Sequence, residues 1–318
     1  MKITNDMIHP ELRQKAVLIR TIFPYFRSSS FKLIHRLQRF TRKKIDASII
    51  CEEYVTSDSV KVFVYKPATS PTSRTGMLWM HGGGYAFGSP KDDAGFINSL
   101  VLETNCVVVA PDYRLSTSAP YPAALEDCYS ALLWMKNNAQ SLGINPNQLF
   151  AAGDSAGGGL TAAISIYARD KKEVAIAFQM PLYPMLDDMM STNSMKNNNA
   201  PIWNEKSNVN AWSLYLKDLY QSNKVPPYAA PSRLQDFSNL PPAFTYIGSL
   251  DPFFDETIAY FHKLREAHVE ASCITFEKCF HAFEVLFPNS TPSKRAKALM
   301  IENLKKAQKK YFATQELS

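Results

Sequence analysis

The sequence predicts an α/β fold in which a mostly parallel sheet carries helices on both faces. Segments typical of strands alternate with segments typical of helices over most of the chain, and such alternation builds parallel sheets. Residues 106–110 (CVVVA) form a fully apolar run, as expected for a strand buried on both faces. Hydrophobic residues make up 46% of the chain and charged residues 20%, which excludes wholesale disorder. A length of 318 residues suits one large domain with an insertion, or two domains.

The expected elements follow one another in order. Residues 1–45 are expected to be helical, because Pro10 suits a first helical position and apolar residues follow it at helical spacing. The alternation of Val60, Val62 and Val64 with other residues then indicates a strand. Further strands are expected at residues 77–80, 106–110, 149–152, 174–180, 243–247 and 271–276. Helices are expected at residues 121–141, 156–169, 256–267 and 292–312.

Residues 186–226 interrupt this alternation. Their first part includes the polar sequence MMSTNSMKNNN, which is poor in strand formers, and a short amphipathic helix is expected after it at residues 212–220. This composition predicts an insertion over one end of the sheet. We therefore expect a catalytic domain formed by residues 46–185 and 227–318, and a helical cap or lid formed by residues 1–45 and 186–226.

Charge and cysteine content restrict the partners and the location of the protein. Lysine and arginine number 35 and acidic residues 29, a formal net charge of +6. The basic stretches at residues 36–44 and 294–310 also carry apolar residues at helical spacing, which favours solvated helix faces over nucleic-acid binding. Five cysteines without CxxC or Cys/His spacing indicate buried thiols in a reducing compartment and no metal site. With no apolar run typical of a signal peptide or a membrane span, a cytoplasmic protein is expected.

Glycine is the residue with the unusual count. The chain has 12 glycines, where an average usage of about 7% would give about 22. Eight of the 12 lie in two short stretches, residues 82–88 and 153–159. Glycine is needed where the backbone takes a positive φ or where another group approaches it closely. These two stretches are therefore the first candidates for a functional site.

The second stretch places a serine in a tight turn. The sequence Gly153-Asp154-Ser155-Ala156-Gly157 fits G-x-S-x-G and lies between an expected strand and an expected helix. Such a turn forces Ser155 into an unfavourable backbone conformation and raises its Oγ above the sheet, and side chains at positions 153 and 157 would clash. The N-terminus of the following helix directs N–H groups at the same place, so the Ala156 N–H is available to bind an oxyanion.

The first stretch, His81-Gly82-Gly83-Gly84, offers backbone N–H groups that no side chain shields. A phosphate-binding loop is disfavoured, because Ser89 stands where that loop needs lysine. A dinucleotide-binding loop is disfavoured as well, because Phe87 occupies the last glycine position of its pattern. An HGGG sequence upstream of G-x-S-x-G is instead typical of esterases and lipases of the α/β-hydrolase fold.

A nucleophilic serine needs a base, and His281 is the expected one. It follows the last expected strand, and open α/β sheets place their sites in loops beyond the carboxyl ends of strands. Among the other histidines, His9 and His35 lie in the N-terminal segment, a structural role is expected for His81, and solvated positions are expected for His262 and His268.

Asp251 is the residue expected to orient the imidazole, since it lies just beyond the strand expected at residues 243–247. Asp255 and Glu256 are expected to cap the next helix. The order serine, acid, histidine along the chain is that of the α/β-hydrolase fold.

Together these residues identify a resemblance to the hormone-sensitive-lipase-like carboxylesterases and acetyl esterases of the α/β-hydrolase superfamily. The resemblance covers the chain from about residue 50 to the end. The matching pieces are His81–Tyr85, Pro111–Leu115, Tyr121–Ala124 with Glu126-Asp127, Gly153–Gly158, Asp251-Pro252 with Asp255-Glu256, and His281–Phe283. The departures are Phe253 where leucine is common, Ala282 where glycine is common, and Gly159 where asparagine is common.

The resemblance implies roles for particular residues. Ser155, Asp251 and His281 would form the catalytic triad, and the N–H groups of Gly83, Gly84 and Ala156 would form the oxyanion hole. The residues that would support them are His81, Gly82, Asp112, Asp154 and Glu256. The candidate walls of the substrate pocket are Tyr85, Phe87, Trp203, Trp212 and Phe253, although ordinary packing explains the two tryptophans equally well.

These observations favour a serine ester hydrolase that cleaves short- to medium-chain acyl esters through an acyl-enzyme intermediate. It would act on a small-molecule ester and need no cofactor or metal, and the family suggests a homodimer. Two alternatives stay open. One is a non-catalytic small-molecule receptor on the same scaffold, which is disfavoured because all three triad residues are present. The other is a hydrolase of amides or lactones, which would use the same chemistry.

Overall fold

The computed structural model describes residues 1–38, 40, 44–68 and 73–315. Its centre is an eight-stranded sheet with the strand order β1-β2-β4-β3-β5-β6-β7-β8. The strands β1 and β2 pair antiparallel, as do β2 and β4, and all other neighbours pair parallel. The strands are β1 (Ile49–Val55), β2 (Lys61–Pro67), β3 (Arg74–Met80), β4 (Val107–Pro111), β5 (Ile144–Asp154), β6 (Phe178–Leu182), β7 (Ala243–Gly248) and β8 (Ala271–Phe276). The prediction of a mostly parallel sheet is confirmed.

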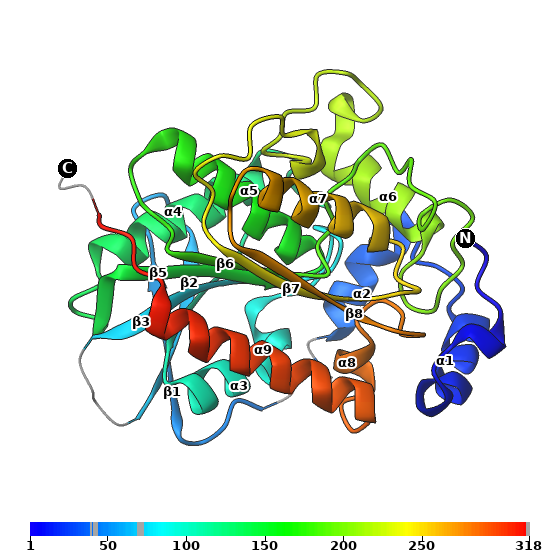
Figure 1. The fold of residues 1–318 in the computed structure, drawn as a ribbon, viewed down its shortest axis with the longest axis horizontal. Coiled ribbons are helices and arrows are strands. Elements are labelled where there is room, and N and C mark those ends of the chain that lie inside the picture. The colour runs from blue at the N-terminus through cyan, green and yellow to red at the C-terminus, as the bar shows by residue number, and fades with distance from the viewer. Residues whose placement is uncertain (39, 41–43, 69–72, 316–318) are drawn as a thin grey trace.

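Helices cover both faces of this sheet, as Figure 1 shows. One face carries α4, α5 and α7, and the other carries α3 and α9. The helices are α1 (Pro10–Ile22), α2 (Phe31–Gln38), α3 (Ala94–Thr104), α4 (Ala123–Asn137), α5 (Ala156–Lys171), α6 (Glu205–Leu216), α7 (Phe254–Glu266), α8 (Phe283–Leu286) and α9 (Thr291–Lys310). None of the helices in the described part of the chain combines the length and the apolar character that a membrane crossing needs.

The central strands are apolar because they lie between two helix layers. Every residue of β3, β4 and β7 is buried, which explains apolar runs such as residues 107–110. In contrast, β1 lies at the sheet edge and is mostly exposed, so its sequence IICEEYV has no strand-like apolar pattern and was not predicted. Helix α3 was also missed.

Several predicted boundaries differ from the structure, including those of β5, α4 and the N-terminal helical segment. Strand β6 begins at Phe178, not at residue 174, and helix α6 spans Glu205–Leu216 where residues 212–220 were expected. The start of α6 is set by the side chain of Asn204, which accepts a hydrogen bond from the Ser207 N–H. Such an N-cap fixes a helix start independently of the apolar pattern used for the prediction.

The segments expected to form a cap contact each other. The Phe26 N–H donates to Ser207 Oγ at 3.0 Å, and Asn210 Nδ2 donates to the Phe26 carbonyl at 2.9 Å. Asn204 Nδ2 also donates to the Pro24 carbonyl at 2.8 Å. In Figure 1, α2 and α6 lie near the end of the sheet where β7 and β8 finish. Their division from the rest of the chain as a separate domain stays a prediction, and residues 39 and 41–43 of the basic stretch 36–44 lie outside the described part.

Two helices end on left-handed residues that are not glycine. Asn105 follows α3 with φ 58°, and Lys172 follows α5 with φ 59°. Each donates its N–H to a carbonyl in the last turn, Asn105 to Val101 and Lys172 to Ala168. Glycine is the usual residue at such positions, because it has no Cβ to crowd the left-handed conformation.

Candidate active site

Ser155 lies in the tight turn between β5 and α5, with φ 55° and ψ −116°. This positive φ confirms the strained backbone that the sequence predicted. A Cβ at Gly153 would meet the Met80 carbonyl oxygen at 2.4 Å, and a Cβ at Gly157 would meet the same oxygen at 2.0 Å. Both positions therefore require glycine, because the end of β3 passes directly against the turn.

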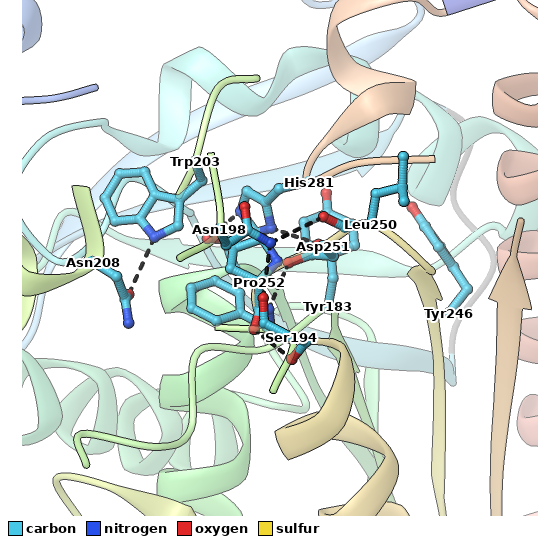
Figure 2. A network of polar contacts seen from close by, with 12 residues as sticks. Tyr183, Ser194, Asn198, Trp203, Asn208, Tyr246, Leu250, Asp251, Pro252 and His281 are labelled. Carbon is cyan, nitrogen blue, oxygen red and sulfur yellow. Dashed lines mark hydrogen bonds and ion pairs between the residues drawn. The ribbon is translucent and has the colours of Figure 1, made fainter. Parts of the chain in front are cut away.

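The side chains of Ser155, His281 and Asp251 form a hydrogen-bonded chain. His281 Nε2 lies 2.8 Å from Ser155 Oγ, and His281 Nδ1 lies 2.8 Å from Asp251 Oδ2. Ser155 is 5% exposed, His281 3% and Asp251 1%. Figure 2 shows His281 facing Asp251 across the loops that follow β8 and β7. The other oxygen of Asp251 accepts the Phe253 N–H at 2.9 Å, which fixes the carboxylate in its turn.

The glycine loop approaches the same place from the end of β3. Gly83 and Gly84 have positive φ values of 114° and 59°. The Gly83 carbonyl accepts the N–H groups of Ala86 and Phe87, and this closes the loop into a turn. Among the backbone hydrogen bonds of the described residues, none uses the N–H of Gly83 or Gly84 as donor. The Ala156 N–H opens α5 and has no partner within the helix, so three donors are available here.

His81 and Gly82 are built into the support of this loop. His81 Nδ1 donates to the Gly82 carbonyl at 2.7 Å, and the Tyr113 hydroxyl donates to the His81 carbonyl at 2.7 Å. The Tyr113 ring stacks on the imidazole with a centroid distance of 4.2 Å. Burial lowers the pKa of His81 to about 4, so the side chain is neutral at physiological pH.

Asp154 also supports the glycine loop, because its carboxylate packs directly against Gly82. A Cβ at Gly82 would meet Asp154 Oδ2 at 2.6 Å, so glycine is required there as well. Burial, together with the neighbouring Asp93 and Glu284, raises the pKa of Asp154 well above its usual range. Asp112 differs from this group: its side chain is exposed, and its backbone N–H donates to the Lys61 carbonyl at 2.9 Å.

Glu256 and Asp255 do not cap helix α7 as the sequence suggested. Glu256 Oε1 accepts the N–H groups of Leu186 and Asp187 at 2.7 and 3.1 Å, and Asp255 Oδ2 accepts the Ser194 N–H at 2.8 Å. Both carboxylates lie in the first turn of α7 but hold the start of the segment 186–226. Burial raises the pKa of Glu256 well above its usual range, with the nearby Asp187 acting in the same direction.

The aromatic residues proposed as pocket walls fall into two groups. Trp203 and Phe253 lie beside the imidazole of His281, with centroid distances of 6.4 and 5.0 Å. The Trp203 ring also lies against the glycine loop, because a Cβ at Gly84 would meet its Cη2 at 2.4 Å.

The second group packs away from the imidazole. Tyr85 stacks on Tyr215 at 3.9 Å and contacts Trp212, both of which belong to α6, and all three side chains are buried. Phe87 packs against Phe26 and Phe31 of the N-terminal segment. Ordinary packing therefore accounts for Tyr85, Phe87 and Trp212.

Several residues near the site were not found from the sequence. Tyr183 follows β6 and lies edge-on to His281 at 5.2 Å. Its place just beyond a strand end is the signal that could have indicated it. Ser194 and Asn198 contact the loop that carries Asp251, and no sequence pattern distinguished them within their polar stretch. Within the described residues, no group of three or more His, Cys, Asp or Glu side chains is arranged to hold a metal ion.

A serine on a strained strand-to-helix turn, in reach of a histidine from a later loop, is the arrangement that characterises hydrolases on this kind of sheet. Comparison with known proteins specifies the family. A family model described as alpha/beta hydrolase fold matches residues 77–285. The chain therefore belongs to the α/β-hydrolase superfamily, in its hormone-sensitive-lipase-like branch, and it is a carboxylic ester hydrolase.

Individual relatives agree with this assignment. The chain is 31% identical to the esterase LipI of Mycobacterium tuberculosis over 223 residues, which are 69% of each protein. It is 32% identical to an arylesterase of Saccharolobus solfataricus over 225 residues, 67% of this chain and 71% of the relative. Among solved structures, a bacterial heroin esterase aligns with a TM-score of 0.88 at 29% identity, covering 96% of this chain and 99% of its own.

Proposed function

We propose that Ser155 attacks the acyl carbonyl of a small ester while His281 Nε2 takes its proton. The observation that carries this proposal is the hydrogen-bonded chain from Ser155 Oγ through both imidazole nitrogens to Asp251. In this proposal Asp251 holds the imidazole with Nε2 free to accept a proton, and stabilises the imidazolium that forms. The same Nε2 then delivers the proton to the leaving alcohol oxygen.

The N–H groups of Gly83, Gly84 and Ala156 bind the oxyanion of the tetrahedral intermediate in this proposal. Their availability as donors supports the assignment. Preorganised donors of this kind typically contribute about 10²–10³ in kcat each. Water then attacks the acyl-enzyme, with His281 acting as general base and Ser155 as leaving group.

The substrate class proposed is an ester with a short acyl chain. Trp203, Phe253 and Tyr183 lie around His281, and Trp203 lies directly against Gly84, so little room is left beside the proposed oxyanion hole. A p-nitrophenyl ester series from acetate to laurate tests this proposal. We expect the highest kcat/KM at four carbons or fewer, and an optimum at long chains would refute it.

Ser155→Ala is the test of the chemistry. Hydrolysis of p-nitrophenyl acetate should fall to the level of a protein-free blank or close to it, and full activity would refute the assignment of the nucleophile. Assay of the matching p-nitroanilide separates esterase from amidase activity. A homodimer and a cytoplasmic location remain further proposals, the first tested by sedimentation velocity. The five free cysteines support the second.

A further inference from the structure

The cap segment 194–200 makes buried hydrogen bonds to the loop that carries Asp251 (Figure 2). Ser194 Oγ donates to the Pro252 carbonyl at 2.9 Å and accepts the Asp255 N–H at 3.1 Å. The residues that follow Asp251 are therefore tied to this segment, although they lie far from it in the sequence.

Asn198 forms the second link and joins three backbone groups at once. Its Nδ2 donates to the Leu250 carbonyl at 3.4 Å and to the Ser194 carbonyl at 2.8 Å. Its Oδ1 accepts the Ala200 N–H at 2.8 Å. The residue is 4% exposed. Breaking these bonds would leave buried carbonyl and N–H groups without partners, which is costly.

The loop that carries Asp251 is held from two opposite sides. On one side, the Leu250 N–H donates to the Cys279 carbonyl at 2.9 Å, which ties the loop to the chain just before His281. On the other side, the Leu250 carbonyl accepts from Asn198. Without Asn198, the peptide groups that precede Asp251 would lose this bond to the cap segment and keep their bonds to residues 276–279.

The same asparagine also fixes the chain that leads to Trp203. It binds the Ala200 N–H, three residues before the indole that lies against Gly84. The indole is fixed at its far end, where Nε1 donates to Asn208 Oδ1 at 3.2 Å. Figure 2 shows Asn198 lying between Trp203 and the Asp251 loop.

We propose that Asn198 is a positioning residue that holds Asp251 against His281 by tying the cap segment to the Leu250 carbonyl. This inference rests on the proposed role of Asp251 in catalysis. It makes the cap a structural part of the catalytic acid site as well as a cover for the substrate.

Two substitutions and one control test the proposal. Asn198→Asp keeps the side-chain volume and the oxygen that accepts the Ala200 N–H, but it replaces the Nδ2 donor that faces two carbonyl oxygens with a second oxygen. Asn198→Ala removes both the acceptor and the donor. Asn199→Ala is the control, because the neighbouring Asn199 accepts the Ile3 N–H at 2.6 Å and, among the described residues, makes no hydrogen bond to the Asp251 loop. We expect kcat for p-nitrophenyl acetate to fall roughly 10- to 100-fold in both Asn198 variants, with KM changed less than about twofold. The control should stay within about twofold.

A double-mutant cycle with Asp251→Asn separates positioning from general structural damage. If Asn198 acts through the Asp251 carboxylate, substituting Asn198 in the Asp251→Asn background should lower kcat by less than about twofold. Equal losses in both backgrounds, or a change confined to KM, would overturn the proposal. Thermal unfolding identifies which variant is folded, and Asn198→Asp carries the test if the alanine variant is not.

The outcome can be separated from that of the proposed function. Activity in Ser155→Ala would refute the proposed nucleophile whatever the Asn198 variants do. An inactive Ser155→Ala variant combined with additive Asn198 losses would refute only the positioning role.

Discussion

Replacing Gly157 with alanine tests how closely the serine turn and the glycine loop must approach. A Cβ at this position would lie 2.0 Å from the Met80 carbonyl oxygen and 2.6 Å from the His81 carbonyl oxygen. Ordinary contact begins at 3.4 Å, so the end of β3 would have to recede by roughly 1.4 Å (3.4 minus 2.0). Both obstructing atoms are backbone, and no side-chain rotation relieves the overlap.

This displacement should act mainly on the chemistry. His81 leads directly into Gly83 and Gly84, so a receding strand end carries the proposed oxyanion donors away from Ser155. A misplacement of about 1 Å costs about 100-fold in rate, and we expect kcat for p-nitrophenyl acetate to fall at least that far. Overpacking should lower the free energy of unfolding by about 1–3 kcal/mol, which a domain of ordinary stability survives.

The matched control is Gly95→Ala. Gly95 is exposed in the first turn of α3, so the added methyl group meets no packed backbone and activity should not change. Urea unfolding of both variants shows whether they are folded under assay conditions. A folded Gly157→Ala variant with activity within about twofold of the wild type would refute the reasoning.

Two further predictions concern His81 and Trp203. Burial lowers the pKa of His81 to about 4 from an ordinary 6.5. As the pH falls, the His81 side chain is therefore protonated in the unfolded chain at a higher pH than in the folded protein. The free energy of unfolding is therefore unaffected by His81 above pH 6.5 and falls as the pH drops from 6.5 to 4. The total loss is about 3 kcal/mol, because a difference of one pKa unit corresponds to 1.36 kcal/mol. His81→Gln should therefore reduce the slope of unfolding free energy against pH over this range, and an unchanged slope in urea titrations would contradict the assignment. Trp203→Ala removes the ring beside Gly84 and should raise kcat/KM for the hexanoate ester relative to the acetate by about 10-fold or more. An equal ratio in both proteins would place the acyl chain elsewhere.

The parts of the site that could be predicted from the sequence depend on local backbone rules. Gly153 and Gly157 flank Ser155 because a turn of this shape admits no other residue, and that requirement can be read in five consecutive letters. The positions of Asp251 and His281 follow from a similar rule, since each lies just beyond a strand of a parallel sheet.

The parts that could not be predicted depend on packing between distant segments. Trp203 and Trp212 lie nine residues apart in the segment 186–226, yet only Trp203 lies beside His281, while Trp212 is part of α6 and packs against Tyr85. Glu256 has the sequence context of a helix-capping residue, yet its carboxylate binds the backbone of residues 186 and 187. Neither outcome has a local signature, because the partner in each case comes from another part of the fold.

The left-handed residues at the ends of α3 and α5 have a consequence for the unfolded state. Asn105 and Lys172 occupy positions where glycine is usual, while most of the chain's 12 glycines lie in the two stretches around Ser155. Glycine loses more conformational entropy on folding than any other residue, so a chain with few glycines begins from a less disordered ensemble. Each non-glycine residue at such a helix end introduces some backbone strain into the folded protein, but it also lowers the conformational entropy of the unfolded chain. The lower entropy at these helix ends partly offsets the entropy cost of the flexible residues that the serine turn and the glycine loop require.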